Sequence, residues 1–433
     1  MEFTLQPGGR VNGRIRVPGD KSISHRSVMF GAIADGVTTV DGFLEGEDAL
    51  CTLKAFQAMG VNIEGPDNGR LVIHGVGRDG LKAPAGPLYV GNSGTSMRLL
   101  AGLLAGQSFD VTMTGDESLN KRPMERVAKP LREMGAVVET GEGGRPPLTL
   151  RGGQQLKGID YVLPMASAQV KSCVLLAGIY ADGTTSTLEP APTRDHSERM
   201  LQGFSYPVTV DGAKASLQGG GRLKGVHIDV PADISSAAFF MVAASITPGA
   251  ELTLEHVGIN PTRIGVINIL RAMGGNLDVE NERLVGGEPV ADITVRYAEL
   301  KGIDIPEDQV PLAIDEFPAL FIAAACAKGR TVLTGAEELR VKESDRIQVM
   351  ADGLVALGID AQPTPDGIVI EGGEMGGATI NPHHDHRIAM AFSVASLRAH
   401  DTILIHDCDN VATSFPNFVE LAKQVGIQIE KRP

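Results

Sequence analysis

The hydrophobic and polar positions of this chain form a pattern that repeats. A short apolar segment typical of a strand, a tight turn and a helix of small apolar residues recur six times. The turns are marked by Pro18, Gly91, Pro164, Pro231, Pro306 and Pro382, which are separated by 73, 73, 67, 75 and 76 positions. This near-constant spacing indicates internal repetition, because six similar openings do not arise easily by chance.

The second half of each repeat is also similar. A helix ends in a Met-Gly or Leu-Gly-like pair, and a segment of alternating apolar and polar residues follows. The pairs are Met59-Gly60, Met134-Gly135, Met273-Gly274, Leu357-Gly358 and Val425-Gly426. Glycine directly after a helix is a common left-handed stop, and the alternation predicts strands. Each repeat therefore predicts the order βαβαββ, and six repeats divide into two similar α/β domains. The third repeat departs from the others, with Phe204-Ser205-Tyr206 at this place.

The first repeat shows how polar residues gather where the helices begin. Residues 17–26 predict the end of a strand, a Pro-Gly turn and the first turn of a helix, which Asp20 or Ser22 can cap. The N–H groups at a helix start have no partners inside the helix, so together with Lys21 and Arg26 they suit a phosphate or carboxylate. Taken alone, the segment favours an ordinary capped helix with two solvated cations. A structural role is expected for His25.

Four further polar segments interrupt the apolar pattern, at residues 92–98, 114–123, 339–346 and 383–387. The first is a glycine-bearing helix start that a ligand can approach closely, and the second is a polar loop that ends in Arg122-Pro123. The third is expected to begin a helix on which Lys342 and Arg346 share a face and Glu343 points away. The fourth holds three histidines, but their spacing does not suit zinc, so no metal site is predicted.

Composition narrows the possibilities. A chain of 433 residues exceeds what one hydrophobic core usually serves, which favours two domains. The net charge of −14 speaks against a sequence-blind nucleic-acid binder. No signal peptide or membrane span is expected, and residues 320–327 form a short apolar run typical of a buried helix. Four cysteines without metal-binding spacing are expected to be reduced packing residues of a cytoplasmic protein: Cys51, Cys173, Cys326 and Cys408.

Cations are concentrated at the helix starts of the repeats or in their loops. They are Lys21, Arg26, Arg122, Lys342, Arg346 and Arg387. An acidic protein that gathers cations in this way is expected to bind an anion, and phosphate together with carboxylate is the favoured chemistry. Asp315 and Glu343 lie among these cations, which suits carboxylates that transfer protons. No Ser-His-Asp order, phosphate-binding Gly-x4-Gly-Lys-Ser/Thr loop or dinucleotide-binding Gly-x-Gly-x-x-Gly turn occurs in a suitable context.

At these segments the sequence resembles the 5-enolpyruvylshikimate-3-phosphate synthase family. The matching motifs comprise residues 18–27, 91–95, 121–124, 164–172, 193–196, 314–316, 339–346 and 385–390. These motifs occur in the family's order from end to end of the chain, which makes the resemblance specific. The form Glu-Leu-Arg-Val-Lys-Glu-Ser-Asp-Arg at residues 338–346 is similar to the branch that includes glyphosate-tolerant members.

The resemblance implies the inside-out α/β barrel of the enolpyruvyl transferases. Two similar domains of three βαβαββ units are expected, a discontinuous one of residues 1–20 plus 228–433 and an inserted one of residues 21–227. Their helix N-termini would face an interdomain cleft that holds the active site. The family transfers the enolpyruvyl group of phosphoenolpyruvate to the 5-hydroxyl of shikimate 3-phosphate in the shikimate pathway, and it uses no metal or organic cofactor.

The resemblance also implies roles for individual residues. Shikimate 3-phosphate would be bound by Lys21, Ser22, Arg26, Ser167, Ala168, Gln169, Arg194, Asp315 and Lys342. Phosphoenolpyruvate would be bound by Lys21, Gly94, Arg122, Gln169, Arg346 and Arg387. Asp315 would accept the proton of the 5-hydroxyl, Glu343 would help to protonate the methylene carbon, and Lys21 would complete the catalytic group. Addition would give a tetrahedral intermediate, from which phosphate is eliminated.

Two positions depart from relatives. Thr413 stands where many relatives carry a lysine near phosphoenolpyruvate, so that contact is not expected here. Gly94 stands where some glyphosate-tolerant relatives carry alanine. Because Gly94 has no methyl group, the inhibitor glyphosate is expected to fit beside shikimate 3-phosphate.

Other functions remain open. UDP-N-acetylglucosamine enolpyruvyl transferase shares the fold, but the cysteine usual in that enzyme is absent from residues 114–122. A non-catalytic repeat scaffold would have no reason to place Asp315 and Glu343 among cations. An RNA-end-processing protein built on related units is disfavoured by the net charge and the few aromatic residues. The protein is expected to be a monomer that acts on small molecules and binds neither nucleic acid nor membrane.

Overall fold

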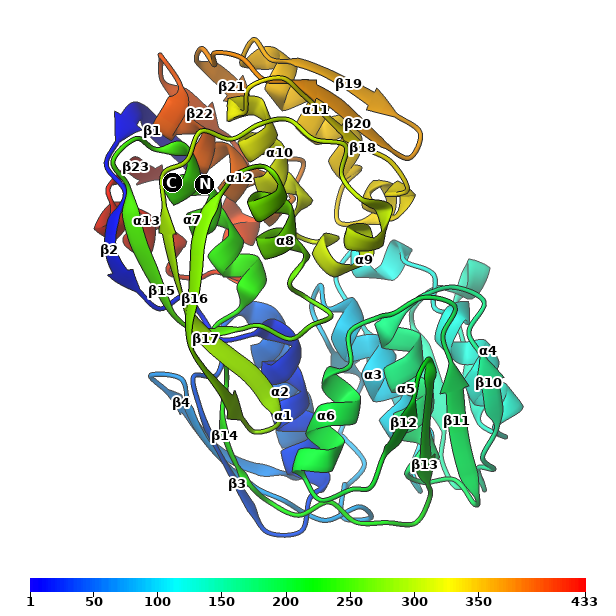
Figure 1. The fold of residues 1–433 in the computed structure, drawn as a ribbon. Helices are drawn as coiled ribbons and strands as arrows, with labels where there is room; N and C mark the ends of the chain where they lie inside the picture. Colours follow the sequence, from blue (N-terminus) through cyan, green and yellow to red (C-terminus); the bar gives the residue numbers. More distant parts are fainter. The chain divides into compact units, whose positions relative to one another are not determined.

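The computed structural model describes residues 1–433 and divides into two compact units (Figure 1). Unit 1 comprises Met1–Pro18, Pro231–Leu284 and Glu288–Pro433, and unit 2 comprises Gly19–Val230 and Val285–Gly287. Each unit has its own cluster of buried hydrophobic side chains.

Unit 2 contains the first three repeats. The first has α1 (Lys21–Ile33), β3 (Val37–Asp41), α2 (Glu47–Ala58), β4 (Asn62–Asp67) and β5 (Arg70–His74). The second has β6 (Leu88–Tyr89), α3 (Gly94–Leu104), β7 (Val111–Thr114), η1 (Leu119–Lys121), α4 (Glu125–Glu133), β8 (Val137–Glu139), η2 (Glu142–Gly144) and β9 (Leu148–Arg151). The third has β10 (Asp160–Val162), α5 (Ala168–Gly178), β11 (Thr184–Leu188), α6 (His196–Gly203), β12 (Thr209–Asp211) and β13 (Lys214–Gln218), and β14 (His227–Asp229) follows it.

Each repeat of unit 2 forms a four-stranded sheet. The strand orders are β14-β3-β5-β4, β6-β7-β9-β8 and β10-β11-β13-β12. The first two strands of each sheet pair in parallel, and the remaining pairs are antiparallel. The second and third repeats therefore have the predicted order βαβαββ along the chain.

Unit 1 contains the other three repeats and the N-terminal strands β1 (Glu2–Gly9) and β2 (Asn12–Ile15). The fourth repeat has α7 (Ile234–Ile246), β15 (Glu251–Gly258), α8 (Gly265–Ala272), β16 (Asn276–Val285) and β17 (Glu288–Arg296). The fifth has η3 (Glu307–Gln309), α9 (Val310–Ala313), α10 (Phe317–Cys326), β18 (Arg330–Leu333), η4 (Glu337–Val341), α11 (Arg346–Ala356), β19 (Asp360–Thr364) and β20 (Gly367–Glu371). The sixth has β21 (Ala378–Ile380), α12 (His386–Ala395), η5 (Ser396–Arg398), β22 (Ile403–Ile405), η6 (Asp409–Thr413), α13 (Phe418–Val425) and β23 (Ile427–Arg432).

The N-terminal strands complete sheets of repeats that lie far along the sequence. In unit 1 the sheet orders are β16-β17-β15-β2, β18-β20-β19 and β21-β22-β1-β23. β2 pairs in parallel with β15, and the strand that opens the first sheet of unit 2 is β14. The repeat pattern assigns the strand before Pro18 to the first repeat and the strand before Pro231 to the fourth, and this assignment is wrong. Both strands have the same apolar pattern, so periodicity alone does not reveal that they are exchanged.

The first helix of a repeat is more deeply buried than the second. All 13 residues of α7 are buried, whereas α13 buries only Phe418, Leu421, Ala422 and Val425. The first helices are therefore buried on most sides, whereas the second helices are buried along one face. The buried run expected at residues 320–327 lies within α10 and the residue after it. None of the helices combines the length and the apolar character that crossing a membrane requires.

The helix stops explain the departure of the third repeat. The glycines that follow the second helices have φ between 89° and 116°: Gly60, Gly135, Gly274, Gly358 and Gly426. At the matching place after α6, Ser205 has φ 65°. Its N–H donates to Gln202 O over 2.9 Å, and Tyr206 N donates to Leu201 O over 2.8 Å. The serine thus adopts the left-handed conformation that glycine has elsewhere.

Candidate functional site

Side chains just before the helices cap most of the helix starts where site residues are expected. Caps whose oxygen accepts a backbone N–H of the first turn are Asp20, Ser93, Ser167, Asp345 and Asp385. Of the two predicted caps of α1, Asp20 is the one used, since its Oδ1 accepts from Ile23 N over 2.9 Å. The capping residues place Lys21, Gly94 and Arg346 at the first positions of their helices.

In unit 2, Arg26 is buried and is held by serine hydroxyls. Its Nε donates to Ser197 Oγ over 2.8 Å, and its Nη2 donates to Ser172 Oγ over 3.2 Å. Its Nη1 donates to the carbonyl oxygen of Ser22 over 3.0 Å. The structure therefore brings Ser22 and Arg26 together. The sequence analysis missed Ser172 and Ser197, although Ser172 lies inside one of the motifs.

Lys21 also has a partner that the sequence did not indicate. Its Nζ forms an ion pair with Asp48 Oδ2, and the Asp48 side chain is buried in the first turn of α2. The carboxylate of Asp48 therefore holds the ammonium group of Lys21 in a defined direction.

The starts of α3 and α5 gather a second group of expected site residues. The two helices lie side by side (Figure 1). Gln169 Oε1 accepts from Arg98 Nη1 over 2.5 Å, and its Nε2 donates to Thr95 Oγ1 over 3.1 Å. These two bonds orient the side-chain amide of Gln169, with its oxygen toward Arg98 and its nitrogen toward Thr95. Arg98 is another contact that the sequence analysis missed.

Gly94 and Arg122 lie close to each other. Arg122 Nη2 donates to Asn92 Oδ1 over 2.8 Å. A methyl group on Gly94 would lie 3.3 Å from Arg122 Nη1, which is tighter than an ordinary contact. The absent side chain at residue 94 thus leaves room for Arg122 at this helix start.

Three further residues that the sequence analysis named lie at two helix starts of the third repeat. Ser167 caps α5 through Val170 N, and Ala168 is the first residue of that helix. Arg194 lies in the segment between β11 and α6 and is partly buried. These positions agree with a site at the starts of α5 and α6.

In unit 1, Arg346 joins both carboxylates that the sequence singled out. Its Nη2 donates to Glu343 Oε2 over 2.7 Å, and its Nη1 donates to Asp315 Oδ1 over 3.5 Å. Lys342 Nζ lies 3.6 Å from the same Asp315 oxygen. Asp315, Lys342, Glu343 and Arg346 are therefore one network.

Asp385 completes this network and was missed by the sequence analysis. Arg346 Nε donates to Asp385 Oδ2 over 2.8 Å, and Asp385 also caps α12 through Arg387 N. Burial alone would lower the pKa of Arg346, but the Asp385 and Glu343 carboxylates outweigh burial and raise that pKa above its usual value. Arg346 is therefore charged, and its donors are largely occupied by carboxylates.

The orientation predicted for Glu343 is wrong. The prediction assumed a helix through residues 339–346, on which Glu343 would point away from Arg346. In the structure η4 ends at Val341 and α11 begins at Arg346, so the residues between them are not helical. This break lets Glu343 turn back onto the guanidinium of Arg346.

The residues around α12 serve different purposes. Arg387 lies in its first turn with a partly buried side chain. His383 and His384 are exposed and have φ of 51° and 61°. Thr413, where a lysine was noted as absent, donates its hydroxyl to Asn410 O over 2.7 Å. This hydrogen bond of Thr413 does not supply the positive charge that a lysine would bring.

His25 is fully buried and lies in a chain of hydroxyls. Its Nδ1 lies 2.8 Å from Thr52 Oγ1, which lies 2.6 Å from Ser96 Oγ. Burial first, and then the charge of Lys21, lower the pKa of His25 to about 3. The ring is therefore neutral, which fits a structural role better than that of a base.

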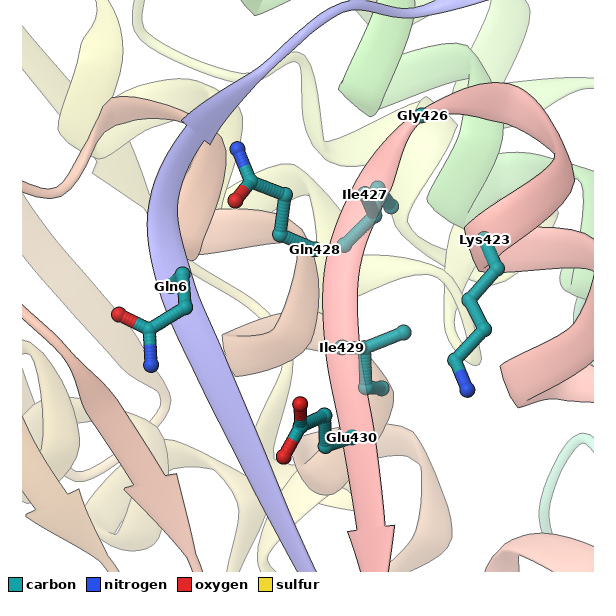
Figure 2. A pocket seen from close by; sticks show the side chains of 7 residues that line it. All are labelled: Gln6, Lys423, Gly426, Ile427, Gln428, Ile429 and Glu430. Atoms are coloured by element: carbon teal, nitrogen blue, oxygen red, sulfur yellow. The ribbon is translucent and has the colours of Figure 1, made fainter.

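One groove lies outside these groups of residues. It runs along β1 and β23, and Gln6, Lys423, Gly426, Ile427, Gln428, Ile429 and Glu430 line it (Figure 2). None of these residues belongs to the predicted site. The lining pairs a single lysine with a single glutamate, so it lacks the group of cations that an anionic substrate requires.

Comparison with known proteins decides the family. The EPSP synthase family, described as 3-phosphoshikimate 1-carboxyvinyltransferase, matches residues 5–421. The chain belongs to the EPSP synthase family. A 3-phosphoshikimate 1-carboxyvinyltransferase of Methylococcus capsulatus is 68% identical over 428 residues, covering 99% of this chain and 98% of that protein. A protein of the same name from Alkalilimnicola ehrlichii is 65% identical over 432 residues, covering 100% and 97%.

A solved structure agrees with this assignment. An EPSP synthase structure from Acinetobacter baumannii has a TM-score of 0.92 and 65% sequence identity, and the match covers 99% of both chains. The predicted family, the α/β fold of the enolpyruvyl transferases and the prediction of an enzyme are confirmed. Membership in the EPSP synthase family also removes the reading as a non-catalytic repeat scaffold.

Proposed function

We propose that this chain transfers the enolpyruvyl group of phosphoenolpyruvate to the 5-hydroxyl of shikimate 3-phosphate and releases phosphate. The observation that carries the proposal is the network in which Asp315 and Glu343 contact Arg346 and Lys342. Two carboxylates held among cations suit a reaction that moves protons between two anionic substrates. The product, 5-enolpyruvylshikimate 3-phosphate, would serve chorismate and aromatic amino-acid synthesis.

Shikimate 3-phosphate is bound mainly through residues of unit 2. Ser22, Arg26, Ser167, Ala168, Gln169 and Arg194 form this set, and Lys21, Asp315 and Lys342 join it. Arg26 is rigidly held by its serine partners, and Ser167 and Ala168 lie where the first N–H groups of α5 begin. Backbone N–H groups and a guanidinium are suited to a phosphate and to ring hydroxyls.

Phosphoenolpyruvate is bound by Lys21, Gly94, Arg122, Gln169, Arg346 and Arg387. Arginine guanidinium groups match carboxylate and phosphate with two parallel hydrogen bonds. Arg346 donates to Asp385, Glu343 and Asp315, so little of its hydrogen-bonding capacity is left for a ligand. We therefore assign most of the anion contacts to Arg122 and Arg387, while Arg346 supplies charge nearby.

The reaction follows addition and elimination. Asp315 accepts the proton of the 5-hydroxyl as the hydroxyl oxygen bonds to the central carbon of phosphoenolpyruvate. Glu343 helps to deliver a proton to the methylene carbon, which gives a tetrahedral intermediate, and Lys21 holds the substrates in contact. The bond from the central carbon to the phosphate oxygen then breaks, Glu343 takes a proton back from the methyl carbon, and the proton held by Asp315 goes to the departing phosphate. The cations hold two mutually repelling anions together, which is a contribution of proximity.

The proposed residues come from both proposed domains, 1–20 plus 228–433 and 21–227. The enzyme is proposed to act as a cytoplasmic monomer, without nucleic acid, membrane or cofactor. The thiols of Cys51, Cys173, Cys326 and Cys408 are all free, as suits a reducing compartment. Sedimentation of the purified protein at several concentrations tests the monomer.

The proposal is tested by phosphate release from phosphoenolpyruvate. Release is expected to require shikimate 3-phosphate in the wild type and to be lost in Asp315→Ala. UDP-N-acetylglucosamine replaces shikimate 3-phosphate in a parallel reaction and is expected to support no release. Release that does not depend on the shikimate compound, or that depends on the nucleotide sugar, contradicts the proposed function.

A further inference from the structure

A fully buried charged group joins α5 and α6 in unit 2. Lys171 lies in α5, and 3% of its side chain is exposed. Its Nζ lies 3.1 Å from Glu189 Oε2 and 3.2 Å from Glu198 Oε2. The side chains of Glu189 and Glu198 are 12% and 5% exposed. Burying three ionisable groups is costly, so this cluster calls for an explanation.

The two glutamates lie at opposite ends of one segment. Glu189 directly follows β11, and Glu198 lies in the first turn of α6. Between them lies Arg194, which is proposed above to bind shikimate 3-phosphate. One ammonium group therefore holds both ends of the segment that presents Arg194.

A hydrogen bond inside the segment carries this constraint to Arg194 itself. Thr193 Oγ1 donates to Glu189 Oε2 over 2.5 Å, and that oxygen is the one that Lys171 approaches. Thr193 directly precedes Arg194 in the chain. The backbone at Arg194 is thus tied to Lys171 through Glu189 and Thr193.

A second connection runs beside the first. Ser197 Oγ donates to Ser172 Oγ over 2.7 Å, and both hydroxyls accept from Arg26. Ser172 and Ser197 are the chain neighbours of Lys171 and Glu198. The same pair of helices therefore sets the direction of Arg26 and of Arg194.

We propose that Lys171 is a positioning residue for shikimate 3-phosphate binding, which it supports by fixing the segment 189–198 against α5. This inference rests on the proposed function. The ammonium charge of Lys171 is compensated by two carboxylates, so it acts through Arg194 and Arg26 and not by touching the substrate. Without Lys171, Glu189 and Glu198 would repel each other across the place it occupied. Burial raises the pKa of Glu198, which is consistent with a carboxylate that depends on this lysine.

The test compares Lys171→Met with the wild type in steady-state kinetics and in calorimetric titration with shikimate 3-phosphate. The KM and Kd for shikimate 3-phosphate are expected to rise at least about tenfold, as for loss of a buried charged contact. The KM for phosphoenolpyruvate is expected to stay within about twofold, because no residue of the segment 189–198 belongs to that site. Lys214→Met is the matched control, since Lys214 lies 4.0 Å from Asp160 and both are exposed.

Two further variants keep the test decisive if Lys171→Met folds poorly. Lys171→Met/Glu198→Gln removes one of the two carboxylate charges that lose the ammonium, which restores the net charge of the wild-type cluster. This variant is expected to fold while affinity for shikimate 3-phosphate remains low. Thr193→Val breaks only the link from Glu189 and is expected to weaken shikimate 3-phosphate severalfold at unchanged stability.

A double-mutant cycle separates positioning from general damage. In an Arg194→Ala background, Lys171→Met is expected to cost less additional affinity than in the wild type, because the part of its effect that is exerted through Arg194 is already lost. Wild-type affinity for shikimate 3-phosphate in a folded Lys171 variant, equal losses for both substrates, or additive effects with Arg194→Ala would overturn the inference. A wild-type protein that does not bind shikimate 3-phosphate would instead overturn the proposed function, and this inference with it.

Discussion

Arg26 in unit 2 and Arg346 in unit 1 are both buried arginines of a candidate site, and their contacts differ in kind. Arg26 donates to two serine hydroxyls and a backbone carbonyl. Arg346 donates to three carboxylates, of Asp315, Glu343 and Asp385. The repeated architecture thus surrounds these two arginines differently, Arg26 with hydroxyls and a carbonyl and Arg346 with carboxylates.

The difference matches the two proposed roles: the residues near Arg26 bind shikimate 3-phosphate, and the carboxylates near Arg346 transfer protons. A binding region benefits from a cation whose direction is fixed by neutral groups. A region that transfers protons benefits from carboxylates whose position and charge are controlled by cations. The two arginines should therefore respond differently to substitution, and the following predictions test that contrast.

The largest effect is expected for Arg346→Met. Asp385 is almost fully buried, and removal of Arg346 leaves its charge without that partner in a site of low polarity. Breaking a buried ion pair in this way costs about 3–5 kcal/mol of unfolding free energy. Catalysis should be lost as well, because Asp315 and Glu343 lose their common contact.

Urea denaturation and initial rates measure both consequences of Arg346→Met. Arg296→Met is the control, because Arg296 pairs with the exposed carboxylates of Glu251 and Asp278 and its loss should change stability little. Equal stability of the two variants would contradict the view that unit 1 depends on its buried ion pairs.

Gly94→Ala probes a helix start that differs from that of α11. The first residue of α11 is a large arginine, whereas α3 begins with a residue that has no side chain. The added methyl group would lie 3.3 Å from Arg122 Nη1, so Arg122 must shift. We expect the KM for phosphoenolpyruvate and the inhibition constant of glyphosate to rise about tenfold or more, a range typical of one methyl group in a tight site.

Gly94→Ala is tested by measuring the inhibition constant of glyphosate at saturating shikimate 3-phosphate. Gly153→Ala is a poor control because of its positive φ, whereas Gly86 has open space around it and a suitable conformation. Gly86→Ala is therefore expected to leave both constants unchanged. An unchanged inhibition constant in Gly94→Ala would show that the space at residue 94 does not set glyphosate binding.

The burial of His25 in α1 predicts that the stability of the protein depends on pH. His25 has its pKa lowered to about 3 by burial, while an unfolded histidine titrates near its ordinary value of about 6.5. Between these values the unfolded chain binds a proton that the folded protein does not, so stability falls as pH falls. The slope from this one residue is about 1 kcal/mol per pH unit.

The contribution of His25 to this slope is measured from the unfolding free energies of wild type and His25→Gln at pH 6.5, 5.5 and 4.5, which lie within about two units of the ordinary histidine pKa. His25→Gln is expected to be less stable at pH 6.5 but to lose less stability on acidification. His400, which is exposed, provides the control variant His400→Gln with a wild-type profile. Parallel profiles for all three proteins would mean that His25 is not kept neutral by folding.

The sequence indicates some parts of the candidate site more clearly than others. Residues 20–26 and 338–346 were recognisable because several charged or small residues lie close together at a helix start. The pairing of these residues with Asp48, Ser197 and Asp385 was not, because each partner comes from another helix start far along the chain. Their side chains are common caps or first-turn residues, and only the folded chain shows which cation each one meets.

The errors have similar causes. The orientation of Glu343 depends on the helix beginning at Arg346, which the Asp345 cap decides. A charge pattern that assumes one continuous helix over residues 339–346 does not reveal this break. The exchange of the strands before Pro18 and Pro231 escaped the repeat pattern because pairing partners are set by three-dimensional packing, while the two strands look alike in sequence.

The smallest expected effect tests how the two units end their outer helices. All three stops in unit 1 are glycines, whereas the third stop in unit 2 is Ser205 with φ 65°. The left-handed conformation strains a serine, and Ser205 is exposed with no packing to lose, so Ser205→Gly should stabilise the protein by roughly 0.5–1 kcal/mol after the entropy of glycine is subtracted. The reverse change Gly358→Ser should destabilise by a similar amount, because the nearest atom to its new Cβ is 3.9 Å away and backbone strain is its main cost. Urea denaturation of both variants decides the point: opposite signs are expected, and equal signs would show that backbone strain at the left-handed stop does not set these stability changes.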